Sequence, residues 1–251
     1  MLRHVPALLL LLTLSACERG VETREDLLSR MAARYDANRG AAGGFVVTGG
    51  GGEATHAALP DSVSTLLPPG VVPSGDAADP GVLGLLAQQV ANVRLLSDTL
   101  RTATLTGPAD RRGHRVYVLT SPPQGGRTLA VVVDAETFDV REIEQAVRAD
   151  TLARPLVTRL LYDDFRTADG LTLPFRVRQL NEGLDQLIPA DQRRTLGDQA
   201  RRERSGAELL PPGASREARM AGLDRQIRLF TEGIQETELR VERVRVLPRG
   251  E

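Results

Sequence analysis

Short segments rich in β-branched residues fill the middle of the chain, and turn residues separate them at regular intervals. The predicted strands cover residues 100–106, 115–120, 128–133, 137–145, 157–165 and 171–179, and a last one covers 237–247. A crossover between parallel strands needs about a dozen residues or more, so connections this short join antiparallel neighbours. The sequence therefore predicts an antiparallel β-meander.

The sixth predicted strand shows the clearest alternation of side chains. Its apolar residues Leu171, Leu173, Phe175 and Val177 alternate with Thr, Pro and Arg. One face of the sheet should therefore be apolar and the other hydrated. Pro174 has no N–H to donate to a neighbouring strand, which predicts an edge, a bulge or a kink at this position.

Two other strands depart from simple alternation. Residues 129–133 are apolar at both parities, which predicts a strand covered on both faces, with a helix as the natural cover. In the last strand the apolar residues change parity, and a bulge near Glu242 or Arg243 would restore one apolar face. The residues brought together by such a bulge are Leu239, Val241, Val244 and Val246.

Helical patterns flank and interrupt the meander. Residues 21–37 predict a helix, and a short strand at 45–48 follows it and stops at Gly49–Gly52. Residues 53–81, rich in Pro, Gly, Ser and Ala, predict a long loop, and 80–92 predict a further helix. Before the last strand, 184–233 predict a helical insertion. Its helices run from Pro189 to Arg204 and from Ser215 to Phe230, and Gly233 ends the second.

The N-terminus predicts export and lipid attachment. Residues 1–16 combine a basic start, a short apolar run and small residues, as a secretory signal peptide does. The segment from Leu14 to Cys17 resembles the bacterial lipobox, which implies cleavage before Cys17 and acylation of its sulfur. An ordinary signal peptide followed by a free Cys is the alternative. We expect residues 17–251 to form one domain, lipid-anchored in the cell envelope and facing the periplasm, with Glu18 favouring the outer membrane.

Composition and motifs argue against several classes of function. A net charge of −1 offers no excess of cations for phosphate backbones, so we expect no nucleic-acid partner. The single Cys excludes an internal disulfide, and the absence of Lys excludes lysine-based catalysis. Asp163 and Asp164 are adjacent on a strand, where neighbours face opposite sides, and His56 and His114 have no recognisable nucleophile partner. We therefore predict no enzyme, no metal site and no cofactor.

The order of residues from the third to the sixth predicted strand resembles that of a known family. A strand ending at Asp134 precedes a turn with Thr137, and a "D-[YF]-R…DG…P" hairpin follows, matched by Asp164, Phe165, Arg166, Asp169, Gly170 and Pro174. This pattern is similar to that of the LolA/LolB-like outer-membrane lipoprotein-sorting family. The resemblance implies an α+β fold in which a curved antiparallel sheet forms an unclosed half-barrel. Helices would cover its concave face, where acyl chains of lipids or lipoproteins bind without a catalytic residue.

On this interpretation the apolar inward side chains line a lipid-binding cavity. The candidates are Val116, Val118, Leu129, Val131, Val133, Val140, Leu171, Leu173, Phe175, Val177, Leu239 and Val241. The competing interpretation is that these residues form an ordinary packed core. A second hypothesis makes the chain an envelope protein-interaction or stress-sensing lipoprotein on the same scaffold. Its protein partner would dock on the helical insertion at 184–233.

Overall fold

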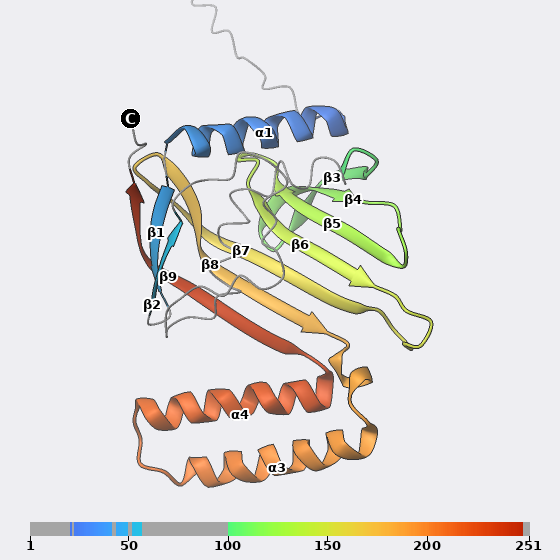
Figure 1. The fold of residues 1–251 in the computed structure, drawn as a ribbon, viewed down its shortest axis with the longest axis vertical. Helices are drawn as coiled ribbons and strands as arrows, with labels where there is room; N and C mark the ends of the chain where they lie inside the picture. Colours follow the sequence, from blue (N-terminus) through green and yellow to red (C-terminus); the bar gives the residue numbers. More distant parts are fainter. Residues whose placement is uncertain (1–20, 22, 42–43, 50–51, 57–99, 248–251) are drawn as a thin grey trace, which may run out of the picture.

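The computed structural model describes residues 21, 23–41, 44–49, 52–56 and 100–247, which form an open antiparallel sheet and three α-helices (Figure 1). The nine strands lie in the order β2-β1-β9-β8-β7-β6-β5-β4-β3, so β2 and β3 are the two edges. The strands are β1 (Gly44–Gly49), β2 (Gly52–His56), β3 (Thr104–Arg111), β4 (His114–Thr120), β5 (Arg127–Asp134), β6 (Val140–Val147), β7 (Leu156–Ala168), β8 (Leu171–Glu182) and β9 (Gln235–Leu247). The predicted α+β class with an unclosed antiparallel meander is confirmed.

Two strands at the edges differ from the prediction. We expected a strand at 100–106 that ends at Gly107, but β3 begins at Thr104 and continues to Arg111. A register shift between Thr106 and Ala109 carries the strand past the Gly-Pro pair. Residues 53–56 were expected in a loop, but they belong to β2, because pairing with β1 orders a sequence that has little strand propensity of its own. The remainder of the predicted loop and the predicted helix at 80–92 lie outside the described residues.

Strand β9 contains the predicted bulge and joins two parts of the sheet. Thr48 pairs with Arg243 while Gly49 pairs with Val241, so Glu242 is the extra residue. The first half of β9 pairs with β8 at Arg176–Asn181, and its second half pairs with β1. Among the described strands, Leu171–Pro174 of β8 therefore pair with β7 alone, and Pro174 lies in this edge segment, as predicted.

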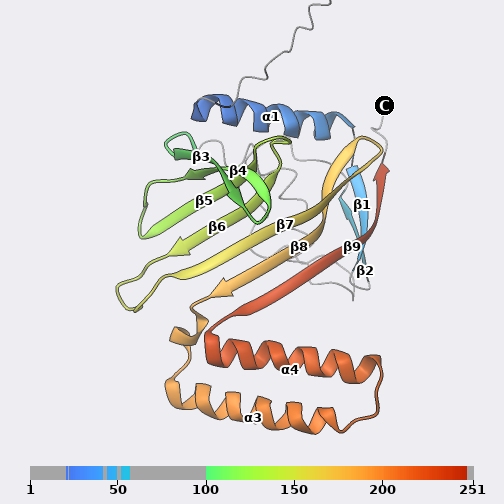
Figure 2. The same cartoon turned by 180° about the vertical axis from the view of Figure 1, so that it is seen from behind.

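The structure does not confirm the predicted helical cover over the concave face of the sheet. Helix α1 (Arg24–Ala41) lies across one end of the sheet and contributes Leu27 and Met31 to the core. Helix α3 (Ala190–Glu208) continues about one turn beyond its predicted end at Arg204. Helix α4 (Ala214–Glu232) lies close to its predicted bounds. These two helices pack against each other beyond the opposite end of the sheet (Figures 1 and 2). We call this pair the helical hairpin.

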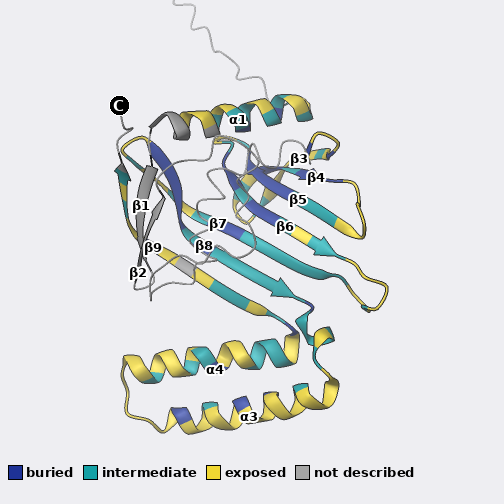
Figure 3. Ribbon diagram, in the orientation of Figure 1, coloured by how far each residue is buried: buried dark blue, intermediate teal, exposed yellow. Residues whose placement is uncertain are grey.

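The helical hairpin stays apart from the sheet because it has little apolar surface to bury. Its buried residues are Gly197, Ala200, Ala207 and Leu223, and most of its other residues are exposed (Figure 3). Small residues allow α3 and α4 to approach closely, while charged residues occupy the remaining surface. The segment 184–233, with the short 3-10 helix η2 (Leu184–Leu187) at its start, is thus helical as predicted but does not cover the sheet.

The two faces of the sheet differ in chemistry. We call the face that carries the main core the inner face and the opposite one the outer face. On the outer face Glu142 is buried and lies 2.9 Å from the guanidinium of Arg111 and 3.9 Å from that of Arg159. Arg159 also pairs with Glu144 and Glu182, which gives a continuous network of charges. Such pairing satisfies carboxylates that burial would otherwise penalise.

Candidate functional site

The inner face carries three rows of side chains that run across the strands. Strand register defines each row, because residues directly opposite one another point to the same face. The apolar row comprises Tyr117, Val133 and Val140, in register across β4, β5 and β6, together with Tyr162 and Val177, in register across β7 and β8, and all five belong to one buried cluster. The mixed row comprises Leu119, Val131, Ile143, Leu160, Gln179 and Thr237. The polar row comprises Leu129, Gln145, Thr158, Asn181 and Gln235.

Most of the predicted cavity residues lie together on the inner face. Val131, Val133, Val140, Leu171, Leu173, Phe175, Val177 and Val241 belong to one buried cluster, and Leu129 packs against it half-buried. Leu239 is in register with Val177, and its side chain is outside the description. Cys17 also lies outside the described residues.

Val116 and Val118 are on the other face, so their predicted inward orientation is wrong. Strand β4 presents the inner face with Tyr117 and Leu119 instead. All four consecutive residues are apolar or aromatic, so periodicity gave no means of choosing a parity, and a one-residue error reverses every side chain. The signal that the sequence analysis missed is the cross-strand register. Tyr117 pairs with Val133 and Leu119 with Val131, both correctly placed.

Helix α1 closes one end of this apolar surface. Leu27 and Met31 are fully buried in the same cluster. The backbone N–H of Val21 donates to the Tyr117 hydroxyl at 3.3 Å, and Arg34 donates to the Asp139 carboxylate at 2.9 Å. These contacts fix α1 to the sheet at the end where the apolar row lies.

Residues of the family-like hairpin surround the aromatic side chains beside this end. Arg166 donates two hydrogen bonds to Asp164, at 3.0 and 2.6 Å, and its guanidinium lies 4.6 Å from the centre of the Phe175 ring. The hydrogen bonds from Arg166 lower the pKa of Asp164. Asp169 and Gly170 both have positive φ, which is the conformation that a two-residue hairpin turn requires. The predicted turn is confirmed, and these two residues have a structural role.

Asp134 organises the turn that follows β5. Its carboxylate accepts hydrogen bonds from the backbone N–H groups of Glu136 and Thr137, each at 3.0 Å, and from the Arg141 guanidinium at 2.9 and 3.0 Å. Burial alone would raise the pKa of Asp134, but these donors outweigh burial and lower it. His114 lies 3.7 Å from the same carboxylate oxygen that Arg141 already contacts. This arrangement accounts for Asp134 as a structural residue of the turn.

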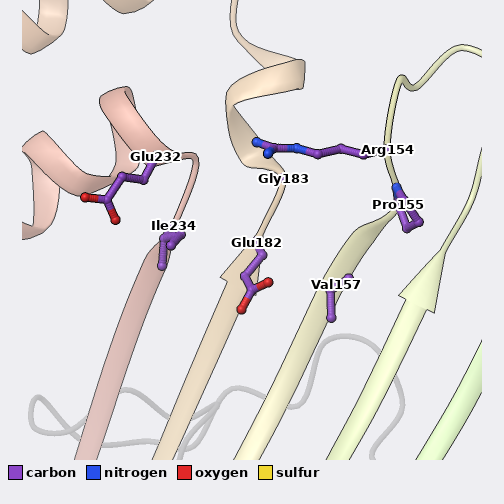
Figure 4. Close-up of a pocket in the computed structure, with 7 residues that line it drawn as sticks. All are labelled: Arg154, Pro155, Val157, Glu182, Gly183, Glu232 and Ile234. Atoms are coloured by element: carbon purple, nitrogen blue, oxygen red, sulfur yellow. The ribbon is translucent and has the colours of Figure 1, made fainter.

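Two surface hollows lie near the helical hairpin. One, of about 420 Å³, is lined by Arg225, Glu236, Thr237 and Glu238 between α4 and β9. The other, of about 270 Å³, lies where β7, β8 and β9 meet the base of the hairpin (Figure 4). It is lined by Arg154, Pro155, Val157, Glu182, Gly183, Glu232 and Ile234. Both hollows have charged rims. Within the described ranges there is no group of three or more His, Cys, Asp or Glu side chains placed to hold a metal ion.

Comparison with known proteins gave no match to a protein-family model, to a curated protein or to a solved structure. Among the helices that the structure describes, none is long and apolar enough to cross a membrane.

Proposed function

We propose that this chain is a non-enzymatic lipoprotein of the bacterial cell envelope that binds lipid or lipoprotein acyl chains against the inner face of its open sheet. The observation that carries the proposal is the continuous apolar surface formed by the apolar row and most of the mixed row. Acyl chains need contact with apolar side chains and no catalytic group, and each buried methylene contributes about 0.8 kcal/mol. The residues of the apolar row are at most 5% exposed, so an acyl chain that binds there must displace side chains that now pack against them, such as Leu27 and Met31 of α1.

The proposed anchor and the proposed binding face fit one orientation. An acylated Cys17 would hold α1, which begins at Arg24, close to the bilayer. The end of the sheet with the apolar row would then face the membrane, and the helical hairpin at the opposite end of the long axis would point away from it (Figure 2). Together with the family-like hairpin around Asp169, this orientation supports a role in outer-membrane lipoprotein sorting.

Native mass spectrometry of the full chain carrying Cys17→Ser tests the proposal. This substitution removes the sulfur that would be acylated, so any lipid retained after purification is bound without a covalent link. We expect one or more acyl-containing molecules bound to the folded protein, and their release on unfolding. A protein that retains no lipid and does not bind an added fatty acid would contradict the proposal.

A second candidate function uses the same anchored scaffold as a docking platform for an envelope protein. The observation that favours it is a set of exposed leucines on and beside the helical hairpin: Leu187, Leu196, Leu209 and Leu210. The base of the hairpin is held firmly. The N–H of Leu184 donates to the carbonyl of Gly233 at 3.0 Å, and Arg193 contacts Asp185 at 2.9 Å. A rigid base presents a surface at a defined angle, which suits recognition of a partner.

The proximity of Leu184 and Gly233 also gives a clean way to separate the two functions. Residues 190–232 can be replaced by a short Gly-Ser turn, because the two ends of the insertion already lie within hydrogen-bonding distance. If the inner face carries the function, the shortened protein keeps its lipid. If the helical hairpin carries it, crosslinking to the envelope partner is lost while lipid retention is unchanged.

A further inference from the structure

The inner face changes from apolar to polar with distance from α1. The apolar row is aliphatic and aromatic throughout, and the mixed row ends in Gln179 and Thr237 on β8 and β9. In the polar row only Leu129, on β5, is apolar. The face is therefore amphipathic along the strands from the apolar row to the polar row, and beyond the polar row it continues with Arg127, Val147 and Leu156.

Hydrogen bonds link the side chains of the polar part. Asn181 is the centre of the group: its amide oxygen accepts from the Thr158 hydroxyl at 2.9 Å and from the Gln179 amide at 3.4 Å. Its amide nitrogen lies 3.5 Å from the side-chain oxygen of Gln235. Thr158, Gln179 and Asn181 are half-buried, and Gln145 and Gln235 are exposed. The group is thus ordered and remains accessible.

Within the polar row, charge is confined to the neighbours that point to the outer face. The four polar residues Gln145, Thr158, Asn181 and Gln235 are uncharged. Each has a charged neighbour in the chain that points to the outer face, and these neighbours are Glu144, Arg159, Glu182 and Glu236. This segregation means that the polar row offers amide and hydroxyl groups alone.

We propose that the polar row binds an uncharged, hydroxyl-rich headgroup, such as the sugar of a glycosyl diacylglycerol, while the acyl chains lie over the apolar row. This inference rests on the proposed function and names the class of lipid that the same face selects. Amides and hydroxyls both donate and accept hydrogen bonds, as sugar hydroxyls do. An anionic phosphate on Thr158 and Asn181 would lose hydration without gaining a cationic partner from the polar row, because Arg127 of the next row lies on β5, with β6 between it and β7.

A competition between two lipids with the same acyl chains tests the inference. The full chain carrying Cys17→Ser is mixed with equal amounts of monogalactosyl diacylglycerol and phosphatidylglycerol in detergent, and the bound species are counted by native mass spectrometry. We expect the galactolipid to be retained at least about tenfold over phosphatidylglycerol. Thr158→Val and Gln145→Leu should each reduce this ratio several-fold while total lipid retention persists.

A matched control distinguishes headgroup binding from loss of a hydroxyl in general. Thr167→Val removes a hydroxyl that bonds Thr172 at 2.9 Å near the β7–β8 turn, away from the polar row, and should leave the ratio unchanged. Gln145 is exposed, so Gln145→Leu keeps the test valid even if Thr158→Val folds poorly. Equal retention of both lipids, or a ratio insensitive to Thr158→Val and Gln145→Leu, overturns the inference and leaves acyl-chain binding intact. If neither lipid is retained, the proposed function itself fails, and this inference fails with it.

Discussion

Gly233 lies so close to Asp185 that a β-carbon on Gly233 would overlap the carboxylate oxygen Oδ1 and come within 2.8 Å of the Asp185 backbone nitrogen. Gly233 ends α4 with φ of 70°, in the left-handed region. Asp185 in turn pairs with Arg154 and Arg193. One close contact therefore joins the end of the helical hairpin, its beginning and the loop before β7.

Replacement of Gly233 by Ala should destabilise the protein. The left-handed backbone costs a residue with a β-carbon about 1–2 kcal/mol, and the overlap with Asp185 adds to this. We expect the free energy of unfolding, measured by urea denaturation, to fall by about 2–4 kcal/mol. Gly222→Ala is the matched control, because its β-carbon would lie 3.9 Å from the nearest atom, a nitrogen of Arg225, within helix α4. That substitution should stabilise by about 0.5–1 kcal/mol, and a similar loss in both variants would contradict this account.

Asp134 should make the free energy of unfolding depend on pH in the acidic range. Burial raises its pKa, but hydrogen bonds from Thr137, Glu136 and Arg141 outweigh this, so the folded value lies below the unfolded one. The stabilisation is then fully present above the unfolded pKa of about 3.9 and is lost as the pH falls through the lower folded value. Denaturant titrations between pH 7 and pH 2 should show this loss.

Asp134→Asn should remove part of that acid dependence and lower stability at pH 7. Loss of hydrogen bonds to a charged acceptor costs about 1.5–3 kcal/mol. Asp198→Asn is the control, since the pKa of Asp198 is also lowered, by its hydrogen bond with Arg201, but the carboxylate is exposed on α3. Its removal should leave the stability at pH 7 close to that of the unaltered chain, because exposed ion pairs contribute little. An unchanged pH profile in Asp134→Asn would show that the turn does not depend on the ionised carboxylate.

Most strands were predictable because their information is local. Alternation in β8 placed Leu171, Leu173 and Phe175 on the core face. The change of parity in β9 predicted a bulge near Glu242 or Arg243, and the structure has it at Glu242. The hairpin turn at Asp169 also follows from its own residues, since Gly170 adopts positive φ without a steric penalty. Patterns that span fewer than ten residues thus sufficed for these elements.

The features that the sequence did not predict depend on contacts between segments that are far apart in the chain. Strand β4 is apolar at both parities, so the inward side of Tyr117 is set by pairing with Val133 and could not be found from β4 alone. The polar row escaped notice for the same reason, because Thr158 and Asn181 are far apart in sequence and meet only through strand register. The placement of the helical hairpin is a tertiary outcome that the periodicity of α3 does not encode.

Leu160→Gln should weaken acyl-chain binding with a modest effect on the fold. Leu160 is a half-buried member of the mixed row, next to Ile143 on the inner face, so an amide there meets the proposed chains directly. We expect the dissociation constant for a fluorescent fatty acid to rise about tenfold, which corresponds to about 1.4 kcal/mol. Leu180→Gln is the matched control: Leu180 is also half-buried, but it lies on the outer face opposite Arg159. Equal weakening in both variants would place the fatty acid elsewhere.

Substitution of Leu209 should leave the stability of the fold almost unchanged, whereas substitution of Leu223 should lower it. Leu209 follows α3 and is 87% exposed, whereas Leu223 on α4 is 6% exposed and packs within the helical hairpin. Leu209→Ser should change the free energy of unfolding by less than about 0.5 kcal/mol, because no packed side chain is removed. Leu223→Ala should lower the free energy of unfolding by about 2–3 kcal/mol through the cavity it leaves.

If the helical hairpin docks an envelope protein, Leu209→Ser should also lower the yield of the crosslink to that protein in cells, because an exposed leucine contributes most where a partner buries it. A crosslink yield equal to that of the unaltered chain would exclude the exposed end of the hairpin from the interface.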